Sequence, residues 1–272
     1  MTYFDKFSLK GKTAIVTGGA GILGKNFCCG LADAGARVAV VDINLEGAQQ
    51  VAEEIKGQMQ GEAKAFYCDL TSEQSIKEMV ENVVAEYGKI DILHNNAAGK
   101  SKDLNAFFAP FEEYDLNQWK EIMSTNLDSM FLVAKYVGKV MKLQGTGGSI
   151  IQTSSIYGVM GPDNRIYEGS YYLNRQINTP AIYSASKAGV IGLTKYLSTY
   201  WAKDGIRVNT ITPGGVESGQ NDAFKHNYSN RIPLGRMAKP EEMVGALIYL
   251  ASDASSYVTG QNLLIDGGLS AW

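Results

Sequence analysis

The sequence predicts an α/β protein with a doubly wound fold, in which helices cover both faces of a seven-stranded parallel sheet. Short runs rich in Val and Ile alternate with longer helical patterns along the whole chain. Such strands, buried on both faces and joined by helices, are typical of parallel sheets. The 272 residues, 45% of them hydrophobic, are enough for one large domain, and no linker or repeat divides them. We therefore expect residues 1–272 to form a single domain.

Seven runs are expected to be strands, because each is short and rich in β-branched residues. They cover residues 12–17, 37–42, 63–68, 89–96, 148–154, 206–212 and 262–266. Each of the first six is followed by a segment long enough for a crossover helix, and these include residues 23–34, 72–87, 116–143, 181–202 and 240–250. Two irregular segments remain, at about 159–182 and 214–233. Loops of that length are usually lids or binding loops, so we expect both to contact a substrate.

Composition excludes several classes of partner. The net charge is -3 and no Lys/Arg run concentrates positive charge, so we expect no nucleic-acid partner. No apolar run reaches the ~20 residues that span a bilayer, and the first residues lack the apolar core of a signal peptide. We therefore expect a cytoplasmic protein without a membrane partner. Cys28, Cys29 and Cys68 have neither a disulfide pattern nor metal-ligand spacing, so we expect no metal.

A glycine-rich turn, VTGGAGILGK, follows the first strand and opens the first helix. Backbone N–H groups and the helix dipole at such a position attract phosphate oxygens, and glycines let the main chain approach closely. Gly19, Gly21 and Gly24 match the pattern G-x-G-x-x-G. We therefore expect a dinucleotide pyrophosphate on this turn, in contact with Gly18, Gly19, Gly21, Ile22, Leu23 and Gly24.

Asp42 ends the second strand, about 18 residues past Gly24. A carboxylate there can accept hydrogen bonds from a ribose hydroxyl and repel a 2'-phosphate. Neither the glycine turn nor Ile43 and Asn44 supplies a cation for that phosphate. The sequence therefore favours NAD over NADP, although Asp42 could also be a solvated residue at the end of a strand.

Two further segments fit the same ligand. Asp69, followed by Leu70, comes after the third strand, where its side chain could reach an adenine edge or simply cap a helix. The fourth strand ends in NNAAG, whose small residues let the backbone come near a ligand. From this segment we expect contacts by Asn96, Ala97 and Ala98.

Tyr183 and Lys187 lie four residues apart at the start of a helical pattern, so they share one helix face. A nearby ammonium favours phenolate over phenol and lowers a tyrosine pKa from its usual ~10. This pairing predicts a tyrosine that takes part in acid/base chemistry.

The glycine turn, Asp42, NNAAG, Ser155, Tyr183 and Lys187 stand in one order along the chain. In this combination the sequence resembles the short-chain dehydrogenase/reductase family along essentially its whole length. The resemblance implies a Rossmann-type sheet with the strand order 3-2-1-4-5-6-7 and a single dinucleotide-binding catalytic domain. It also implies a homotetramer, assembled through the helices at 116–143 and 181–202.

The resemblance also implies a role for each catalytic residue. Ser155 would donate a hydrogen bond to the substrate oxygen while Tyr183 passes the proton. Lys187 would lower the pKa of Tyr183 and bind the nicotinamide ribose. Asn126 would hold a water molecule that links Lys187 to solvent. Ser154 is excluded because the family's serine stands three residues before a glycine, as Ser155 does here. Further cofactor contacts are implied for the segment after the sixth strand, at Pro213, Gly214, Val216 and Ser218.

Two features depart from the family's small members. Their glycine turn usually reads TGxxxGxG, whereas TGGAGILG fits the TGxxGxxG of the larger nucleotide-sugar epimerases and dehydratases. The 28 positions from Ser155 to Tyr183 are also about twice the usual spacing. The inserted segment carries several Tyr and Arg residues, which suit a polyhydroxylated or anionic substrate, although it could instead contact another subunit. The insertion is similar to that of oxidoreductases from bacterial flagellin-modification or nine-carbon-sugar gene clusters.

These observations predict an NAD-dependent oxidoreductase that interconverts a secondary alcohol and a ketone on a sugar or sugar-acid derivative. Two alternatives stay open. One is a nucleotide-sugar epimerase or dehydratase that recycles tightly bound NAD, as the glycine turn suggests. The other is a non-catalytic protein that senses dinucleotides.

Overall fold

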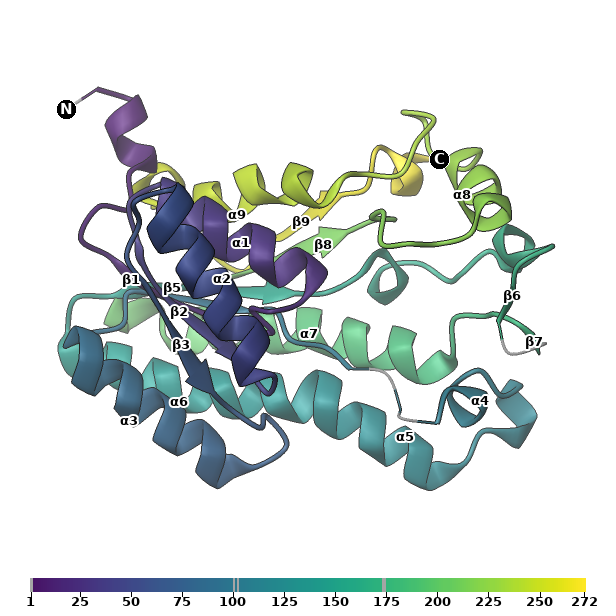
Figure 1. Cartoon of the computed structure of the whole chain (residues 1–272), viewed down its shortest axis with the longest axis horizontal. Coiled ribbons are helices and arrows are strands. Elements are labelled where there is room, and N and C mark those ends of the chain that lie inside the picture. The colour runs from purple at the N-terminus through teal and green to yellow at the C-terminus, as the bar shows by residue number, and fades with distance from the viewer. Residues whose placement is uncertain (1, 100, 102, 173–174) are drawn as a thin grey trace.

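The computed structural model describes residues 2–99, 101, 103–172 and 175–272, with one parallel sheet at its centre (Figure 1). The seven strands are β1 (Thr13–Thr17), β2 (Arg37–Asp42), β3 (Ala63–Tyr67), β4 (Ile92–Asn95), β5 (Gly148–Thr153), β8 (Ile206–Pro213) and β9 (Asn262–Ile265). Their order is β3-β2-β1-β4-β5-β8-β9, and every neighbouring pair is parallel. Counted along the chain within this sheet, the order is 3-2-1-4-5-6-7. The predicted doubly wound fold is confirmed.

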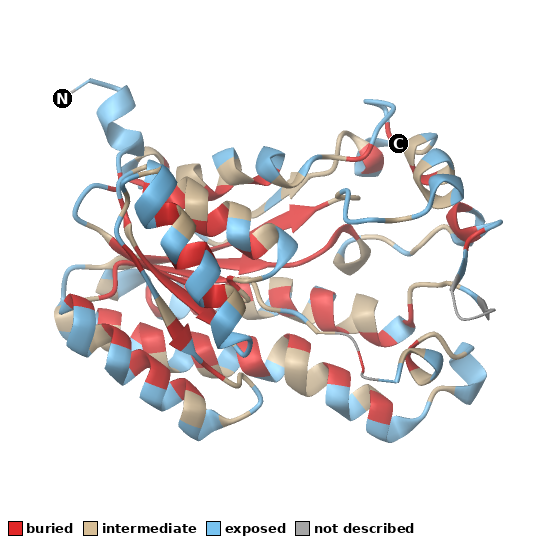
Figure 2. Ribbon diagram, in the orientation of Figure 1, coloured by how far each residue is buried: buried red, intermediate tan, exposed pale blue. Residues whose placement is uncertain are grey.

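Helices pack against both faces of the sheet, and the buried residues follow the strands and the inner sides of the helices (Figure 2). One face is covered by α1 (Ile22–Asp33), α2 (Leu45–Gln58) and α9 (Val244–Ala251). The other is covered by α3 (Glu73–Tyr87), α6 (Ser129–Gln144) and α7 (Ala181–Tyr200). Burial of one large apolar side chain contributes roughly 1.5–3 kcal/mol to the free energy of folding. The two apolar layers therefore stabilise the sheet and fix the positions of its strand ends.

Local sequence explains where the helices begin and end. The hydroxyl of Ser72 accepts a hydrogen bond from the Ser75 N–H at 3.2 Å and so caps the start of α3. That helix stops at Gly88, which has φ +77°, a conformation that favours glycine. Gly145, with φ +69°, ends α6 in the same way.

The helix expected at 116–143 is interrupted. α5 (Leu116–Met123) passes into a π-helical turn at Ser124–Asp128 before α6 begins. The turn carries Asn126, which is buried and whose Oδ1 accepts a hydrogen bond from the Gly99 N–H at 2.8 Å. Single π-turns inside helices are frequent at functional sites, because they aim one side chain out of the regular pattern.

The two segments expected to be irregular carry short elements and pack against each other. The first contains a hairpin of β6 (Tyr171–Tyr172) and β7 (Arg175–Gln176), and the second contains α8 (Asp222–Ser229). Both lie at the same end of the molecule (Figure 1). The Asn227 side chain donates to the Glu168 carbonyl at 2.9 Å, and Arg231 pairs with Asp163 at 2.6 Å. They therefore form one joint structure, called here the lid.

Within the described ranges, no helix is long and apolar enough to cross a membrane. No group of three or more His, Cys, Asp or Glu side chains that could hold a metal ion occurs in the same part of the chain. The cytoplasmic location stays a prediction.

Candidate active site

The candidate site lies where β1, β4, β5 and β8 end, on the side of the sheet that the lid faces. β1 and β4 are neighbours, and the chain crosses over between them, so a ligand crevice is expected outside their carboxyl ends. Thr17, the last residue of β1, ties the two strand ends together. Its hydroxyl accepts hydrogen bonds from the N–H groups of Asn96 at 3.0 Å and Ala97 at 3.1 Å. Thr17 opens the TGGAGILG motif, and its role as a link between the two strand ends was not predicted from the sequence.

The glycine turn has the shape of a phosphate cradle. Gly18 adopts φ +66°, and a Cβ atom there would meet the Cα of Ala97 at 3.0 Å. At Gly24 a Cβ atom would lie 1.9 Å from the Gly18 carbonyl oxygen, so no larger residue fits without moving the turn. The first turn of α1 opens beside these glycines, and within the described residues no side chain caps it. Its N–H groups are therefore available to an anion, and the turn fits the pyrophosphate of a dinucleotide.

The glycine pattern TGxxGxxG, which replaces the TGxxxGxG of the family's small members, does not change the conformation of this turn. Gly21, the displaced glycine, has φ -73° and ψ 169°, an extended conformation open to any residue. Ile22 begins α1 and is 54% exposed. TGGAGILG therefore folds into the strand–turn–helix expected of a dinucleotide site. Its glycine pattern does not require the fold of the larger epimerases.

Asp42 stands against the glycine turn at the end of β2. Its Oδ2 accepts a hydrogen bond from the Ala20 N–H at 3.0 Å, and its Oδ1 accepts one from the Asn44 N–H at 2.9 Å. No ion pair to Asp42 forms in the described part of the chain. The carboxylate is thus held rigidly, and its charge lies close to the phosphate cradle.

The expected adenine contacts lie beyond β3. The Oδ1 of Asp69 accepts hydrogen bonds from the N–H of Thr71 at 2.9 Å and from its hydroxyl at 2.7 Å. Asp69 does not cap α3, because Ser72 does. Leu70 is half-buried next to it, and Ala98 is exposed after β4.

Ser155, Tyr183 and Lys187 meet at the end of β5. Ser155 begins the turn that follows this strand, and its hydroxyl is close enough to Tyr183 to oppose the rise of that residue's pKa. Lys187 comes from the next turn of α7, and its Nζ lies 5.9 Å from the centroid of the Tyr183 ring. This Nζ donates to the Thr153 carbonyl at 3.0 Å. The fold therefore brings together three of the four residues that we predicted to be catalytic.

Burial shifts the pKa values of Lys187 and Tyr183. It lowers the pKa of Lys187, which is 1% exposed, to about 8. It raises the pKa of Tyr183, an effect that the nearby Ser155 hydroxyl opposes. Desolvation disfavours the phenolate and is the larger cause, so the Tyr183 pKa rises and is not lowered as we expected from Lys187. Tyr183 is therefore a neutral phenol at neutral pH, the form that donates a proton.

Ser154 and Ser155 have different tasks. The Ser154 hydroxyl is buried and donates to the Lys187 carbonyl at 2.7 Å, which joins β5 to α7. The Ser155 Oγ accepts a hydrogen bond from the Tyr157 N–H at 3.3 Å, so its position is fixed while its own proton can still be donated. The geometry thus favours Ser155 as the serine that faces a substrate.

Asn126 lies beneath the site in the π-turn. Its Oδ1 is used by Gly99, whereas its Nδ2 is buried and has no hydrogen-bond partner among the described residues. A buried amide with a free donor is costly unless a partner is supplied, which fits the predicted role in holding a water molecule.

The segment after β8 closes one side of the cradle. Pro213 ends the strand, and a Cβ atom at Gly214 would meet the Cα of Asp266 at 2.8 Å. Val216 forms a bridge with Ala238. Ser218 is exposed, and its hydroxyl accepts a hydrogen bond from Gln220 at 2.8 Å.

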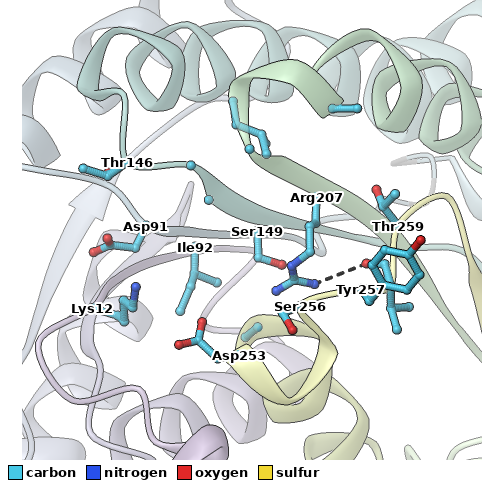
Figure 3. A pocket seen from close by; sticks show the side chains of 17 residues that line it. Lys12, Asp91, Ile92, Thr146, Ser149, Arg207, Asp253, Ser256, Tyr257 and Thr259 are labelled. Carbon is cyan, nitrogen blue, oxygen red and sulfur yellow. Dashed lines mark hydrogen bonds between the residues drawn. The ribbon is translucent and has the colours of Figure 1, made fainter.

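A separate hollow of about 570 Å³ lies at the opposite, amino-terminal end of the strands (Figure 3). Arg207 lines it, but the guanidinium donates to the Ser255 hydroxyl at 2.9 Å and to the carbonyls of Leu250 and Ser252. Its donors therefore hold β8 against the end of α9 and are not available to a ligand. The residues that line this hollow include none of those predicted for the site.

Comparisons with known proteins agree with this geometry. Residues 19–270 match the family model described as enoyl-(acyl carrier protein) reductase. The chain is 37% identical to D-threitol dehydrogenase of Mycolicibacterium smegmatis, over 97% of this chain and 95% of the relative. Its structure is similar to that of a short-chain type dehydrogenase/reductase from Mycobacterium marinum, with a TM-score of 0.87 and 35% identity over the full length of both chains. A gluconate 5-dehydrogenase from Burkholderia cenocepacia, in complex with NADP and tartrate, also has a TM-score of 0.87, with 31% identity and full coverage of both chains.

The match extends over nearly the whole chain, and the strand order and the glycine turn agree with it. The resemblance to flagellin-modification oxidoreductases has no support from these relatives. The chain belongs to the short-chain dehydrogenase/reductase family and is an oxidoreductase that uses a nicotinamide cofactor.

Proposed function

We propose that the chain is a single-domain, NAD-dependent oxidoreductase that interconverts a secondary alcohol and a ketone on a sugar or sugar-acid derivative. One observation carries the proposal: Ser155, Tyr183 and Lys187 come together at the same strand ends as the glycine cradle. A proton-transferring phenol beside a dinucleotide crevice is the arrangement that alcohol oxidation and ketone reduction require.

Each side chain has a distinct task in this proposal. Ser155 donates a hydrogen bond to the substrate oxygen, which stabilises the charge that develops there. Tyr183 donates its proton to that oxygen during reduction and accepts it during oxidation. Lys187 holds the nicotinamide ribose, and Asn126 orders the water behind Lys187. The glycine cradle, Asp42 and the segments 96–98 and 213–218 bind the cofactor, with Asp69 and Leu70 beside the adenine. The bound nicotinamide supplies or accepts the hydride.

The substrate class is supported by the relatives and by the lid. D-Threitol is a polyol and gluconate is a sugar acid, so two relatives act on small polyhydroxylated molecules. The lid of this chain contributes Tyr167 and Tyr228, which combine an apolar ring with a hydroxyl, to the apolar cluster that also contains Ile156 next to Ser155. No observation favours either an epimerase or a dinucleotide sensor.

A substrate panel tests the proposal. The purified protein is mixed with NAD⁺ and a series of polyols, aldonic acids and simple secondary alcohols, and NADH formation is followed. We expect net NADH formation, equal to the ketone produced, with at least one polyol or aldonic acid. NADH formation with simple alcohols only would contradict the substrate class. Conversion without net NADH would instead indicate an epimerase.

The preference for NAD is tested at Asp42. Asp42→Asn removes the negative charge but keeps an oxygen that can accept the Ala20 N–H. Because repulsion of the 2'-phosphate is lost, we expect the ratio of kcat/KM with NAD⁺ to that with NADP⁺ to fall at least about tenfold, which corresponds to ~1.4 kcal/mol. The gluconate 5-dehydrogenase complex shows that NADP binds in a relative, so the wild-type ratio is the reference. An unchanged ratio would refute the assigned role of Asp42.

We also propose a homotetramer. Phe131 on α6, together with Tyr196 and Tyr200 on α7, is exposed on the helical face farthest from the sheet, and the two tyrosine rings stack at 5.8 Å. Apolar side chains gathered on one face commonly mark a subunit interface. Light scattering is expected to give about four times the chain mass of 29.5 kDa. A monomer mass would exclude the assembly.

A further inference from the structure

His94 is a buried histidine that contacts the end of β5, directly behind the catalytic lysine. It lies in β4, and its side chain has no exposed surface. Phe27 of α1 packs edge to face against its ring, with ring centroids 4.3 Å apart. The Nε2 of His94 lies 2.9 Å from the hydroxyl oxygen of Thr153. The ring therefore has a fixed position next to the residue whose carbonyl accepts the Lys187 Nζ at 3.0 Å.

The neighbouring hydrogen bonds decide which atom is the donor between His94 and Thr153. The side-chain amide of Asn96 is oriented by its Nδ2, which donates to the Thr17 carbonyl at 3.1 Å. Its Oδ1 accepts a hydrogen bond from the Thr153 hydroxyl at 3.5 Å. A hydroxyl carries one proton, so the Thr153 oxygen accepts from His94. His94 is thus the donor through Nε2–H. Its Nδ1 then carries no proton and needs no acceptor, which agrees with its lack of a partner among the described residues.

Burial keeps this donor in one protonation state. It lowers the pKa of His94 to about 3, because an enclosed site disfavours the charged imidazolium. The pKa of Lys187 is lowered only to about 8. Throughout the pH range in which Lys187 changes its charge, His94 is therefore a neutral donor and adds no second positive charge to the strand ends.

Thr153 depends on these side-chain hydrogen bonds because it is the last residue of β5. The ladder between β4 and β5 ends one residue earlier, whereas the ladder between β5 and β8 includes Thr153. On the β4 side, Thr153 is tied through its hydroxyl to His94 and Asn96. Without this tie, the carbonyl that accepts the Lys187 ammonium would be held by the sheet on one side only.

We propose that His94 is a positioning residue, which donates a hydrogen bond to Thr153 and thereby sets where the Lys187 ammonium lies. This inference rests on the proposed function, in which Lys187 holds the nicotinamide ribose. An ammonium has three donors and the Thr153 carbonyl takes one, so two are left for the ribose. A shift of this carbonyl would move the ammonium with it and weaken the hydrogen bonds to the ribose. The same hydrogen-bond chain continues through Asn96 to Thr17, so it also joins Lys187 to the strand ends that border the cofactor crevice.

A double-mutant cycle on the affinity for NADH tests the inference. His94→Phe keeps a planar ring against Phe27 but removes the donor. Thr153→Val removes the hydroxyl but keeps the carbonyl that accepts from Lys187. We expect each variant to weaken NADH binding about 5- to 20-fold. The double variant is expected to match Thr153→Val within about twofold, because both changes remove the same hydrogen bond. Fluorescence titration of NADH measures the four affinities.

Two further variants separate positioning from stability. His94→Gln returns a side-chain N–H donor and is expected to bind NADH within about threefold of the wild type. Leu93→Val shortens the neighbouring side chain of β4, which is buried in the apolar layer on the opposite face of the sheet. It is expected to lower the melting temperature and to leave the NADH affinity unchanged.

Nitrogen NMR of protein with isotope-labelled histidine tests the donor directly and needs no cofactor. The chain has 2 histidines, so the signals of His226 are identified by their loss in His226→Gln. We expect His94 to be the neutral tautomer with the proton on Nε2 throughout the pH range in which Lys187 titrates. Its Nε2–H signal is expected to shift in Thr153→Val.

The outcomes separate this inference from the proposed function. Losses of NADH affinity that multiply in the double variant would overturn the inference, because His94 and Thr153 would then act independently. Unchanged affinity in His94→Phe, a proton on Nδ1, or an equal loss of affinity in Leu93→Val would overturn it as well, while the proposed function would stand. A wild-type protein that binds no NADH would overturn both.

Discussion

Replacement of Tyr183 with phenylalanine is expected to lower kcat about 10²- to 10⁴-fold, the range that one positioned acid/base group contributes. The change removes only the hydroxyl, and the ring keeps its place beside Lys187. The affinity for NADH is expected to stay within about twofold, because the glycine cradle is untouched. Steady-state kinetics and NADH fluorescence titration measure the two effects separately.

The control for this variant is Tyr257→Phe, which loses a hydroxyl that is exposed to solvent. If Tyr183→Phe kept kcat within about threefold of the wild type, Tyr183 would not be the proton donor. If it lost NADH binding and kcat together, the hydroxyl would serve the cofactor site and not the proton transfer.

Gly24→Ala is expected to have a comparably large effect, but on the cofactor and the fold. The new Cβ atom would lie 1.9 Å from the Gly18 carbonyl oxygen and 2.9 Å from the Cα of Gly19. Both are backbone atoms, so the turn itself must move. Overpacking of this kind costs about 1–3 kcal/mol or more of the folding free energy. The moved cradle is expected to weaken NADH binding at least about 100-fold.

Gly57→Ala is the matched control, because Gly57 is a helical residue in α2 with nothing within 4 Å of the added Cβ atom. This exchange is expected to be neutral or to stabilise the protein by up to about 1 kcal/mol. Thermal melts and NADH titration of the three proteins test the comparison. Normal NADH affinity in Gly24→Ala would show that the dinucleotide does not lie on this turn.

The sheet could be predicted from the sequence because its strands are buried on both faces. The run 37–42 has no alternation of polar and apolar residues, and α3 has the capping serine and the terminal glycine that mark the ends of a helix. The interruption at Asn126 was missed for a physical reason. Residues 116–143 keep a helical pattern throughout, and the π-turn depends on a contact with Gly99, which is distant in sequence. The β6–β7 hairpin was missed because strands of two residues have no periodicity.

In the candidate site, too, some features could be predicted from the sequence and others depend on tertiary contacts. Spacing predicted that Tyr183 and Lys187 belong together, the resemblance to the family added Ser155, and the fold brings all three together. Spacing could not predict the protonation of Tyr183, because desolvation depends on the packing around the side chain. Nor could spacing find Thr17, whose hydrogen-bond partners Asn96 and Ala97 come to it only in the tertiary structure.

Isotope transfer is the most direct test of the central claim, that a carbon held by Ser155 and Tyr183 exchanges hydride with the bound nicotinamide. A polyol that the protein oxidises is deuterated at the reacting carbon and converted with NAD⁺. The account predicts one deuterium in each NADH formed, one NADH for each ketone, and loss of this transfer in Tyr183→Phe. Product that forms without deuterium in the released NADH would contradict it.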